Sequence, residues 1–96
     1  MTLTGKQKRK LRALGHHLTP VVQIGQHGLS EGVLSATGQA LLDHELIKIK
    51  LGEGIESRHE AAAQLADGTG SEVAQVLGRT VLLFKRKDED SKFEKL

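Results

Sequence analysis

The sequence predicts an α/β (α+β) domain in which packed helices cover a mixed four-stranded sheet. Three observations predict it: apolar residues switch between helical and alternating spacing, capping residues precede the helical stretches, and a hairpin signal lies near the end. The elements follow in the order αβαβαββ. The segments between the early strands are long enough for helical crossovers, whereas two residues join the last pair. We therefore expect parallel and antiparallel pairing in one sheet.

A basic helix is predicted over residues 5–16. Thr4 and Gln7 fit a capping box, in which the threonine caps the helix and the glutamine reaches back to it. Helical spacing forms a narrow apolar stripe, which we expect to lie on the sheet and which comprises Gln7, Leu11, Leu14 and, if the helix continues, Leu18. The remaining positions should present cations to solvent, namely Lys6, Lys8, Arg9, Lys10 and Arg12.

A glycine loop is predicted between the first strand and the second helix. Pro20 biases the residue before it toward extended backbone, and residues 21–24 form a short β-branched strand. Gly25–Gly28 then makes a tight loop, after which Ser30 caps a helix that runs to about Asp43. The residues expected to face inward from this helix are Val33, Leu34, Ala40 and Leu41.

A second strand and a third helix follow. Residues 46–51 alternate, so that Lys48 and Lys50 face away from the apolar side formed by Ile47, Ile49 and Leu51. Residues 56–67 form an alanine-rich helix, which the glycines of residues 68–70 end. Its inward residues are expected to be Ala62, Ala63, Leu65 and Ala66.

The chain should finish as a hairpin and a tail. Strands over residues 72–77 and 80–85 are joined at Gly78 and Arg79, and a two-residue connection of this kind predicts a tight turn. We expect one domain over residues 1–86. The remainder, residues 87–96, is mostly charged and is expected to fray.

Charge is unevenly distributed along the chain. Residues 1–30 carry five Lys or Arg and no Asp or Glu, whereas residues 45–72 carry six acidic and three basic residues. Such segregation favours one basic face, and a basic face suits a polyanion such as nucleic acid. The alternative is a solvated helix surface without a partner.

The sequence lacks the residue patterns that several classes of protein require. The absence of Cys excludes a disulfide framework and thiolate metal sites. His16 and His17 are adjacent, so their side chains diverge, and His59 has no second histidine at the spacing of a zinc protease helix. No phosphate-binding loop, dinucleotide fingerprint or serine elbow is present. We expect no catalytic residues, no metal, no cofactor and no small-molecule substrate.

The sequence also indicates where in the cell the protein should reside. No stretch approaches the roughly 18 consecutive apolar residues that a membrane helix needs. The residues after Met1 include no apolar region of a secretory signal. We therefore expect a cytoplasmic protein without a membrane partner.

Four segments in order carry a resemblance to a known family. They are Gly5–Arg12 (GKQKRKLR), Val22–Val33 (VQIGQHGLSEGV), His44–Lys50 (HELIKIK) and Gln75–Phe84 (QVLGRTVLLF). With these motifs the chain resembles the CRM domain (chloroplast RNA splicing and ribosome maturation), in particular its stand-alone bacterial YhbY form. The resemblance covers roughly residues 2–86.

The resemblance implies a fold and a partner. The fold would be similar to the C-terminal domain of translation initiation factor three, with an added N-terminal helix. The partner would be precursors of the large ribosomal subunit. Phe84 departs from the pattern, because the family often has Tyr there, and this weakens any argument for a polar aromatic contact at that position.

The chemistry of the Gly25–Gly28 loop also points to nucleic acid. Two glycines let backbone approach a sugar–phosphate chain closely, and the loop opens a helix whose free N–H groups favour an anion. KH domains clamp nucleotide backbone with a loop of this form. Gln26 and His27 can donate hydrogen bonds, but neither is strongly cationic. The alternative is a plain turn between strand and helix.

The positive charge that would attract RNA must therefore come from residues outside this loop. The candidate RNA-contacting cations are Lys6, Lys8, Arg9, Lys10 and Arg12 in the first helix, Lys48 and Lys50 in a strand, and Arg79, Lys85 and Arg86 near the last hairpin. Lys48 and Lys50 are equally explained as residues on the solvent-exposed face of a strand. The alternative for Arg79 is a solvated turn residue without an RNA contact.

These features predict a non-enzymatic protein that binds ribosomal RNA or large-subunit precursors, with ribosomal proteins as further partners. With no Trp or Tyr, and only Phe84 and Phe93, recognition should rely on RNA backbone and shape rather than on stacking. The alternative is a protein–protein adaptor on the ribosome or on an assembly GTPase, which would use the acidic middle segment.

Overall fold

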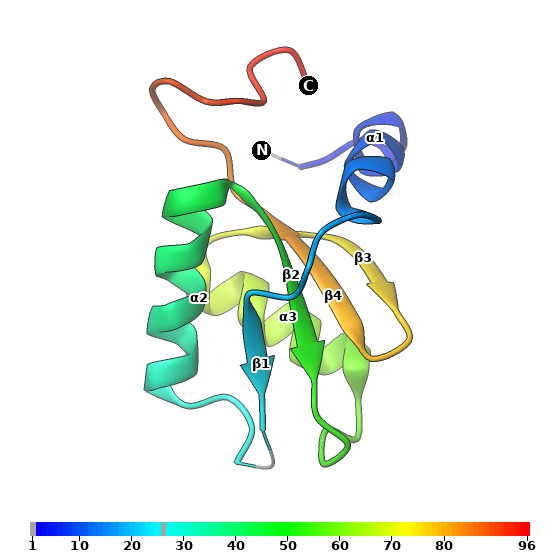
Figure 1. Cartoon of the computed structure of the whole chain (residues 1–96), viewed down its shortest axis with the longest axis vertical. Coiled ribbons are helices and arrows are strands. Elements are labelled where there is room, and N and C mark those ends of the chain that lie inside the picture. The colour runs from blue at the N-terminus through cyan, green and yellow to red at the C-terminus, as the bar shows by residue number, and fades with distance from the viewer. Residues whose placement is uncertain (1, 26) are drawn as a thin grey trace.

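The computed structural model contains the seven elements in the predicted order (Figure 1). It describes residues 2–25 and 27–96. The elements are α1 (Gly5–Gly15), β1 (Val22–Ile24), α2 (Glu31–His44), β2 (Leu46–Leu51), α3 (Arg58–Thr69), β3 (Glu72–Leu77) and β4 (Thr80–Phe84). The capping box of α1 is present, and Ser30 caps α2 as predicted.

The sheet is mixed, as its connections require. Its order is β1-β2-β4-β3, with β1 parallel to β2 and both other pairs antiparallel. The register places Val22 opposite Ile49 and Leu46 opposite Phe84. Because β1 pairs with β2 only from Ile49 onward, the first part of β2 extends beyond the start of β1.

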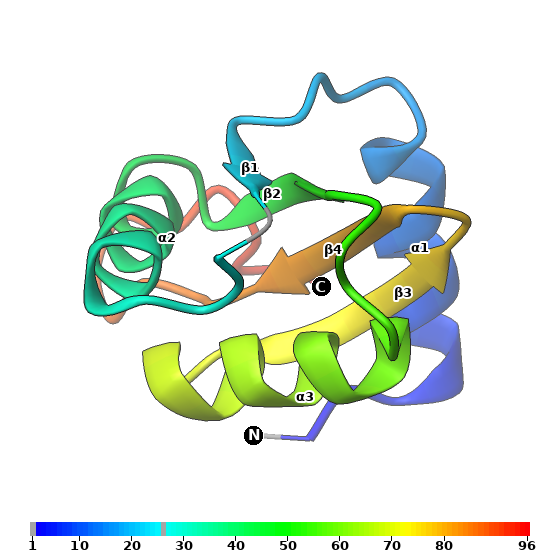
Figure 2. The same ribbon diagram turned by 90° about the horizontal axis from the view of Figure 1, so that it is seen from below.

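Helices lie on both faces of this sheet. Figure 2 shows α2 and α3 on one face and α1 on the other. The first core lies between the sheet and the helix pair, and its buried residues are Ile24, Leu41, Ile47, Ile49, Leu51, Ala61, Ala62, Leu65, Val81 and Leu83. A second core lies under α1 and comprises Leu3, Leu11, Leu46, Ala74, Leu82 and Phe84.

Three details of the helices differ from the sequence prediction. Leu14 is 47 % exposed, because α1 touches the sheet chiefly through Leu11 and Gly15. Leu14 therefore does not belong to the part of the predicted apolar stripe that packs on the sheet. Helix α3 begins at Arg58, after the cap Ser57, whose Oγ accepts a hydrogen bond from the Glu60 amide at 3.2 Å. Ala63, which is predicted to face inward, is exposed, and Ala61 is buried in its place.

Gly52 holds the end of β2 against the end of β1. Its N–H donates to the Ile24 carbonyl at 2.8 Å. A Cβ on Gly52 would lie 2.7 Å from that same backbone oxygen, which cannot rotate away. The close approach therefore joins the loops that follow the two parallel strands.

We expect Gly52→Ala to destabilise the fold. The clash should lower the free energy of unfolding by about 1–3 kcal/mol, the usual cost of overpacking. Gly38→Ala is the matched control, because nothing lies within 4 Å of the place that its new methyl group would take on α2. There alanine should raise the free energy by about 0.5–1 kcal/mol. Urea denaturation measures both, and equal stability of the two variants would contradict the role given to Gly52.

Candidate nucleic-acid interface

The Gly25–Gly28 loop projects from the end of the sheet where both parallel strands finish (Figure 1). The Gly28 N–H donates to the Gly25 carbonyl at 3.1 Å, and Gly28 has a φ of 70°, which favours glycine. Nothing lies within 4 Å of the Cβ positions of either glycine. His27 is exposed, and Gln26 lies outside the described residues. The backbone is therefore open at Gly25 and at Gly28.

The surroundings of the loop differ in charge on its two sides. On the α3 side, Glu56 and Glu60 line a hollow together with Gly28. On the other side of the sheet, Lys50 pairs in register with Gln23, two residues before Gly25. An anion that reaches the loop is therefore favoured from the Lys50 side.

Most predicted cations gather on that side of the sheet. Ile47, Ile49 and Leu51 face the first core, so alternation places Lys48 and Lys50 on the α1 side. We call this surface the basic face; it consists of Lys48, Lys50 and the α1 cations Lys6, Lys8, Arg9, Lys10 and Arg12. Lys8 and Lys48 are half-buried, whereas the others are exposed.

The Arg79 side chain instead bonds to backbone carbonyl groups of the protein itself. Its guanidinium donates to the carbonyl oxygens of Gly52 and Ile55, the latter at 3.1 Å. Arg58 reinforces the same region by donating to the Gly78 carbonyl at 2.8 Å. These contacts tie the hairpin turn to the β2–α3 loop, so a structural role accounts for Arg79.

Lys85 and Arg86 lie at the opposite end of the sheet from the glycine loop. They follow Phe84, which pairs with Leu46 at the start of β2, whereas the loop lies beside its end. The Lys85 Nζ donates to the Thr69 carbonyl at the C-terminal end of α3, at 3.0 Å. The structure therefore brings the loop near Lys50 but does not bring Lys85 or Arg86 to it.

A buried carboxylate, which sequence reasoning missed, holds the C-terminal tail. Glu45 is fully buried and has a φ of 66°, which is unusual for a residue other than glycine. Its carboxylate accepts hydrogen bonds from the Lys87 amide at 3.0 Å, the Lys92 amide at 2.8 Å and the Ser91 hydroxyl. The prediction that the tail frays is wrong, because these bonds fold it back onto the domain.

Apolar contacts complete the docking of the tail. The Phe93 ring meets the buried Phe84 ring edge-on, with 5.1 Å between centroids. Phe93 and Leu96 pack against the second core, and the Gln7 side chain donates to the Leu96 carbonyl at 3.3 Å. Phe84 is therefore committed to the core.

The Glu45 carboxyl is ionised in the folded protein at neutral pH. Burial alone raises its pKa, but the hydrogen bonds from Ser91 and from the Lys87 and Lys92 amides, with the charge of Lys87, outweigh burial. They hold the pKa of Glu45 below its ordinary value of 4.5. A carboxyl whose pKa is lowered by folding stabilises the fold above its unfolded pKa, and that contribution is lost as the pH falls through the folded pKa.

The described residues contain neither a metal cluster nor a membrane-spanning helix. Across residues 2–25 and 27–96, no group of three or more His, Cys, Asp or Glu side chains is placed to hold a metal ion. Within the same ranges, none of the helices has the length and apolar character to cross a membrane.

Comparison with known proteins agrees with the geometry. The model of the CRS1 / YhbY (CRM) domain matches residues 3–85. "Probable RNA-binding protein YqeI" of Bacillus subtilis is 38% identical over 93 residues, which cover 96% of this chain and 97% of the relative. "Probable RNA-binding protein PA4753" of Pseudomonas aeruginosa is 37% identical over 93 residues, covering 96% and 89%.

A solved structure is similar as well. The solution structure of the hypothetical protein SAV1595 from Staphylococcus aureus superposes with a TM-score of 0.81 at 34% identity, covering 94% of this chain and 95% of that one. The fold and its basic face define a small α+β binding module, and the names of its relatives describe RNA-binding proteins rather than enzymes. The chain belongs to the CRS1/YhbY (CRM) domain family.

We expect Glu45→Gln to loosen the tail. The amide loses the charge and turns a donor toward other donors, so the free energy of unfolding at pH 7 should fall by about 1–3 kcal/mol. The wild-type protein should also lose tail protection as the pH falls below about 4.5, whereas the variant should lack that dependence. Hydrogen exchange of the Lys92 amide measures both effects.

The control is Glu94→Gln, which alters an exposed carboxylate in the same tail. It should leave stability and exchange unchanged. Identical exchange in the Glu45→Gln variant and the wild type would show that the carboxylate does not hold the tail.

Proposed function

We propose that this protein binds structured RNA through its basic face and the Gly25–Gly28 loop, and that its target is ribosomal RNA in precursors of the large subunit. The observation that carries the proposal is the gathering of cations from α1 and β2 on one side of the sheet, where Lys50 pairs in register with Gln23, two residues before the glycine loop. The RNA-binding names of the relatives support it.

The basic face suits RNA backbone better than bases. Its cations sit on a helix and a strand, where they meet phosphates along a surface rather than in one pocket. Phe84 is buried and Phe93 is half-buried in the tail, so the two phenylalanine rings do not form a row on which successive bases could stack along α1 and β2. Binding should therefore be largely electrostatic and tolerant of sequence.

The loop would add short-range contacts. Open backbone at Gly25 and Gly28 allows a sugar–phosphate chain to approach, and the N-terminus of α2 favours negative charge. The acidic side chains of the α3 surface would keep the RNA on the opposite side of the molecule. Such a role would place the protein in the cytoplasm with the assembling ribosome.

In-cell crosslinking with sequencing of the bound fragments tests the target. We expect ribosomal RNA of the large subunit to be enriched over messenger and transfer RNA, most strongly in particles that precede the mature subunit. Association with a ribosomal protein or a GTPase that survives complete nuclease digestion, without crosslinked RNA, would favour the adaptor alternative.

The salt dependence of binding tests the basic face. If four to six cations meet phosphates, log K should fall with log salt at a slope of roughly −3 to −5. Replacing Lys8, Arg9 and Arg12 together by Gln should reduce the slope by about 2 to 3. It should weaken binding to all structured RNAs alike. Titrations of a fluorescent hairpin at several salt concentrations measure this.

Lys85→Gln is the control, because that side chain bonds to the end of α3. Its effect on the slope should be smaller than one third of that of the triple variant. A slope near zero in the wild type would contradict the role of the basic face.

The loop is tested by adding charge to it. Gln26→Asp with His27→Asp keeps both glycines, and the two carboxylates should repel a phosphate and occupy the helix N-terminus themselves. RNA affinity should fall at least about tenfold, with a near-normal melting temperature.

Ser35→Asp with Ala63→Asp adds the same charge at exposed positions of α2 and α3, and should leave affinity nearly unchanged. Unchanged affinity in a stable loop variant would show that RNA binds elsewhere. Unfolding of the loop variant would show that the loop side chains are structural.

A further inference from the structure

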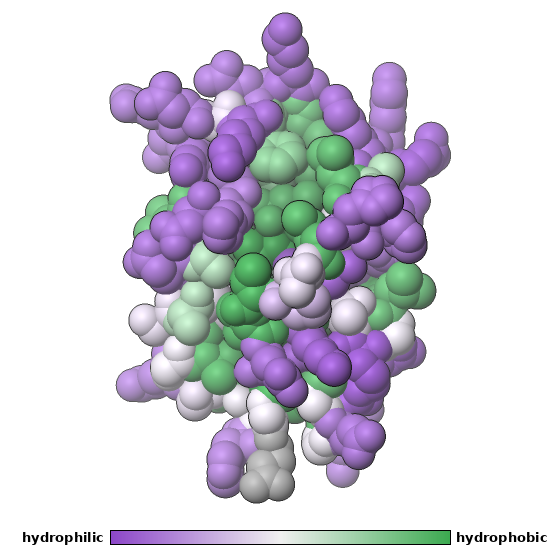
Figure 3. Space-filling model, in the orientation of Figure 1, coloured by the Kyte–Doolittle hydropathy of each residue, from purple (hydrophilic) through white to green (hydrophobic). Residues whose placement is uncertain are grey.

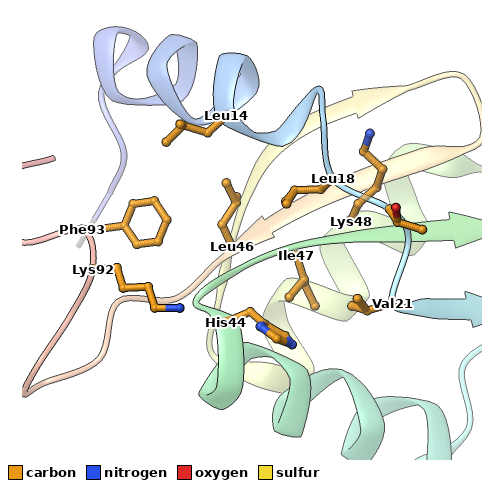
Figure 4. A pocket seen from close by; sticks show the side chains of 10 residues that line it. Leu14, Leu18, Val21, His44, Leu46, Ile47, Lys48, Lys92 and Phe93 are labelled. Carbon is orange, nitrogen blue, oxygen red and sulfur yellow. The ribbon is translucent and has the colours of Figure 1, made fainter.

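An apolar groove opens on the same side of the molecule as the basic face (Figure 4). It has a volume of about 490 Å³ and lies over the start of β2, between the end of α1 and the docked tail. Figure 3 shows apolar side chains in a strip down the centre of this view, with hydrophilic side chains on both sides. Pockets that hold small organic groups have volumes of roughly 300–1,000 Å³, so the groove is large enough for a ligand.

The packing of the fold leaves this groove uncovered. Gly15 rests on Leu82, and a Cβ there would lie 2.5 Å from Leu82 Cδ1, so α1 ends in close contact with the sheet. The chain then turns toward β1 and leaves three apolar side chains in the groove, Leu14, Leu18 and Val21, which are 47 %, 37 % and 52 % exposed. Exposed apolar side chains that gather in one hollow mark a binding site more often than scattered ones do.

The tail supplies the opposite wall. Phe93 lines the groove, and its position follows from the bonds that Glu45 makes to the tail. Of the two aromatic residues in the chain, Phe93 is the one that is not fully buried. The groove therefore combines aliphatic side chains with one aromatic ring.

The lining is cationic as well as apolar. Lys48 and Lys92 stand at the groove, His44 lies at its α2 end, and none of the ten lining residues is Asp or Glu. An adjoining hollow of about 110 Å³ shares Leu14, Lys92 and Phe93 and adds Lys10 and Lys95. The fitting ligand is one that joins a flat apolar group to negative charge.

We propose that the groove receives an unpaired nucleotide of the bound RNA. The base would lie against Leu14, Leu18 and Phe93, with its flanking phosphates toward Lys48 and Lys92. RNA-binding proteins commonly recognise unstacked bases in bulges and loops, because paired bases in an A-form helix present little to a side chain. This inference rests on the proposed function. An acidic, apolar protein segment would fit the charges too, but RNA is favoured because the groove opens among the cations of the basic face.

The test compares two hairpins that differ by one unpaired uridine in the stem. The wild-type protein should bind the bulged hairpin about tenfold more tightly than the continuous one. Leu18→Ser with Val21→Ser should abolish most of this preference and keep the affinity for the continuous hairpin. The control is Leu42→Ser with Leu77→Ser, which alters leucines that are 58 % and 60 % exposed away from the groove. It should keep the preference.

Photocrosslinking provides a second measurement, which shows where on the protein the unpaired nucleotide binds. With 4-thiouridine at the bulge, photocrosslinks should map to the peptide that contains Leu18 or to the one that contains Phe93. Equal wild-type affinity for the two hairpins, or a preference that the groove variant retains, would overturn the inference while leaving RNA binding intact. A preference that the groove variant retains would instead favour an acidic, apolar protein segment as the occupant of the groove. Failure of the wild-type protein to bind either hairpin would overturn the proposed function itself.

Discussion

The alternation of β2 is the constraint on which the rest of the structure depends. This central strand is apolar on both faces at its start and on one face further along. Ile47, Ile49 and Leu51 point into the core beneath α2 and α3, while Leu46 points into the second core beneath α1. A shift of one residue would exchange these sets and bury Lys50. The same alternation places Lys48 and Lys50 on the face of the sheet that α1 covers.

The proposed function depends on two faces of the sheet that differ in charge. One face of the sheet is covered by α2 and α3, and four acidic residues lie on α3 and the loop before it, namely Glu53, Glu56, Glu60 and Asp67. The other face is only partly covered, by α1 and the tail. It therefore carries the cations of the basic face and the apolar groove. The tail, held by Glu45, is both a cover for the second core and a wall of that groove.

Features set by local chemistry could be predicted from the sequence. The capping box at Thr4, the cap at Ser30 and the alternation of β2 depend on neighbours in the chain, and the structure confirms them. Features set by distant contacts could not. Glu45 bonds to Ser91, and no local pattern joins these residues. The turn that Arg79 occupies was predicted, but its bonds to Gly52 and Ile55 depend on how two loops meet.

Hydrogen exchange of the protein with and without a structured RNA fragment tests directly which side of the molecule binds. Protection on RNA binding should appear in α1, in the Gly25–Gly28 loop and at Lys48 and Lys50, and α3 should exchange as in the free protein. Protection confined to α3, with α1 and the loop unchanged, would contradict the assignment of the basic face as the RNA-binding surface.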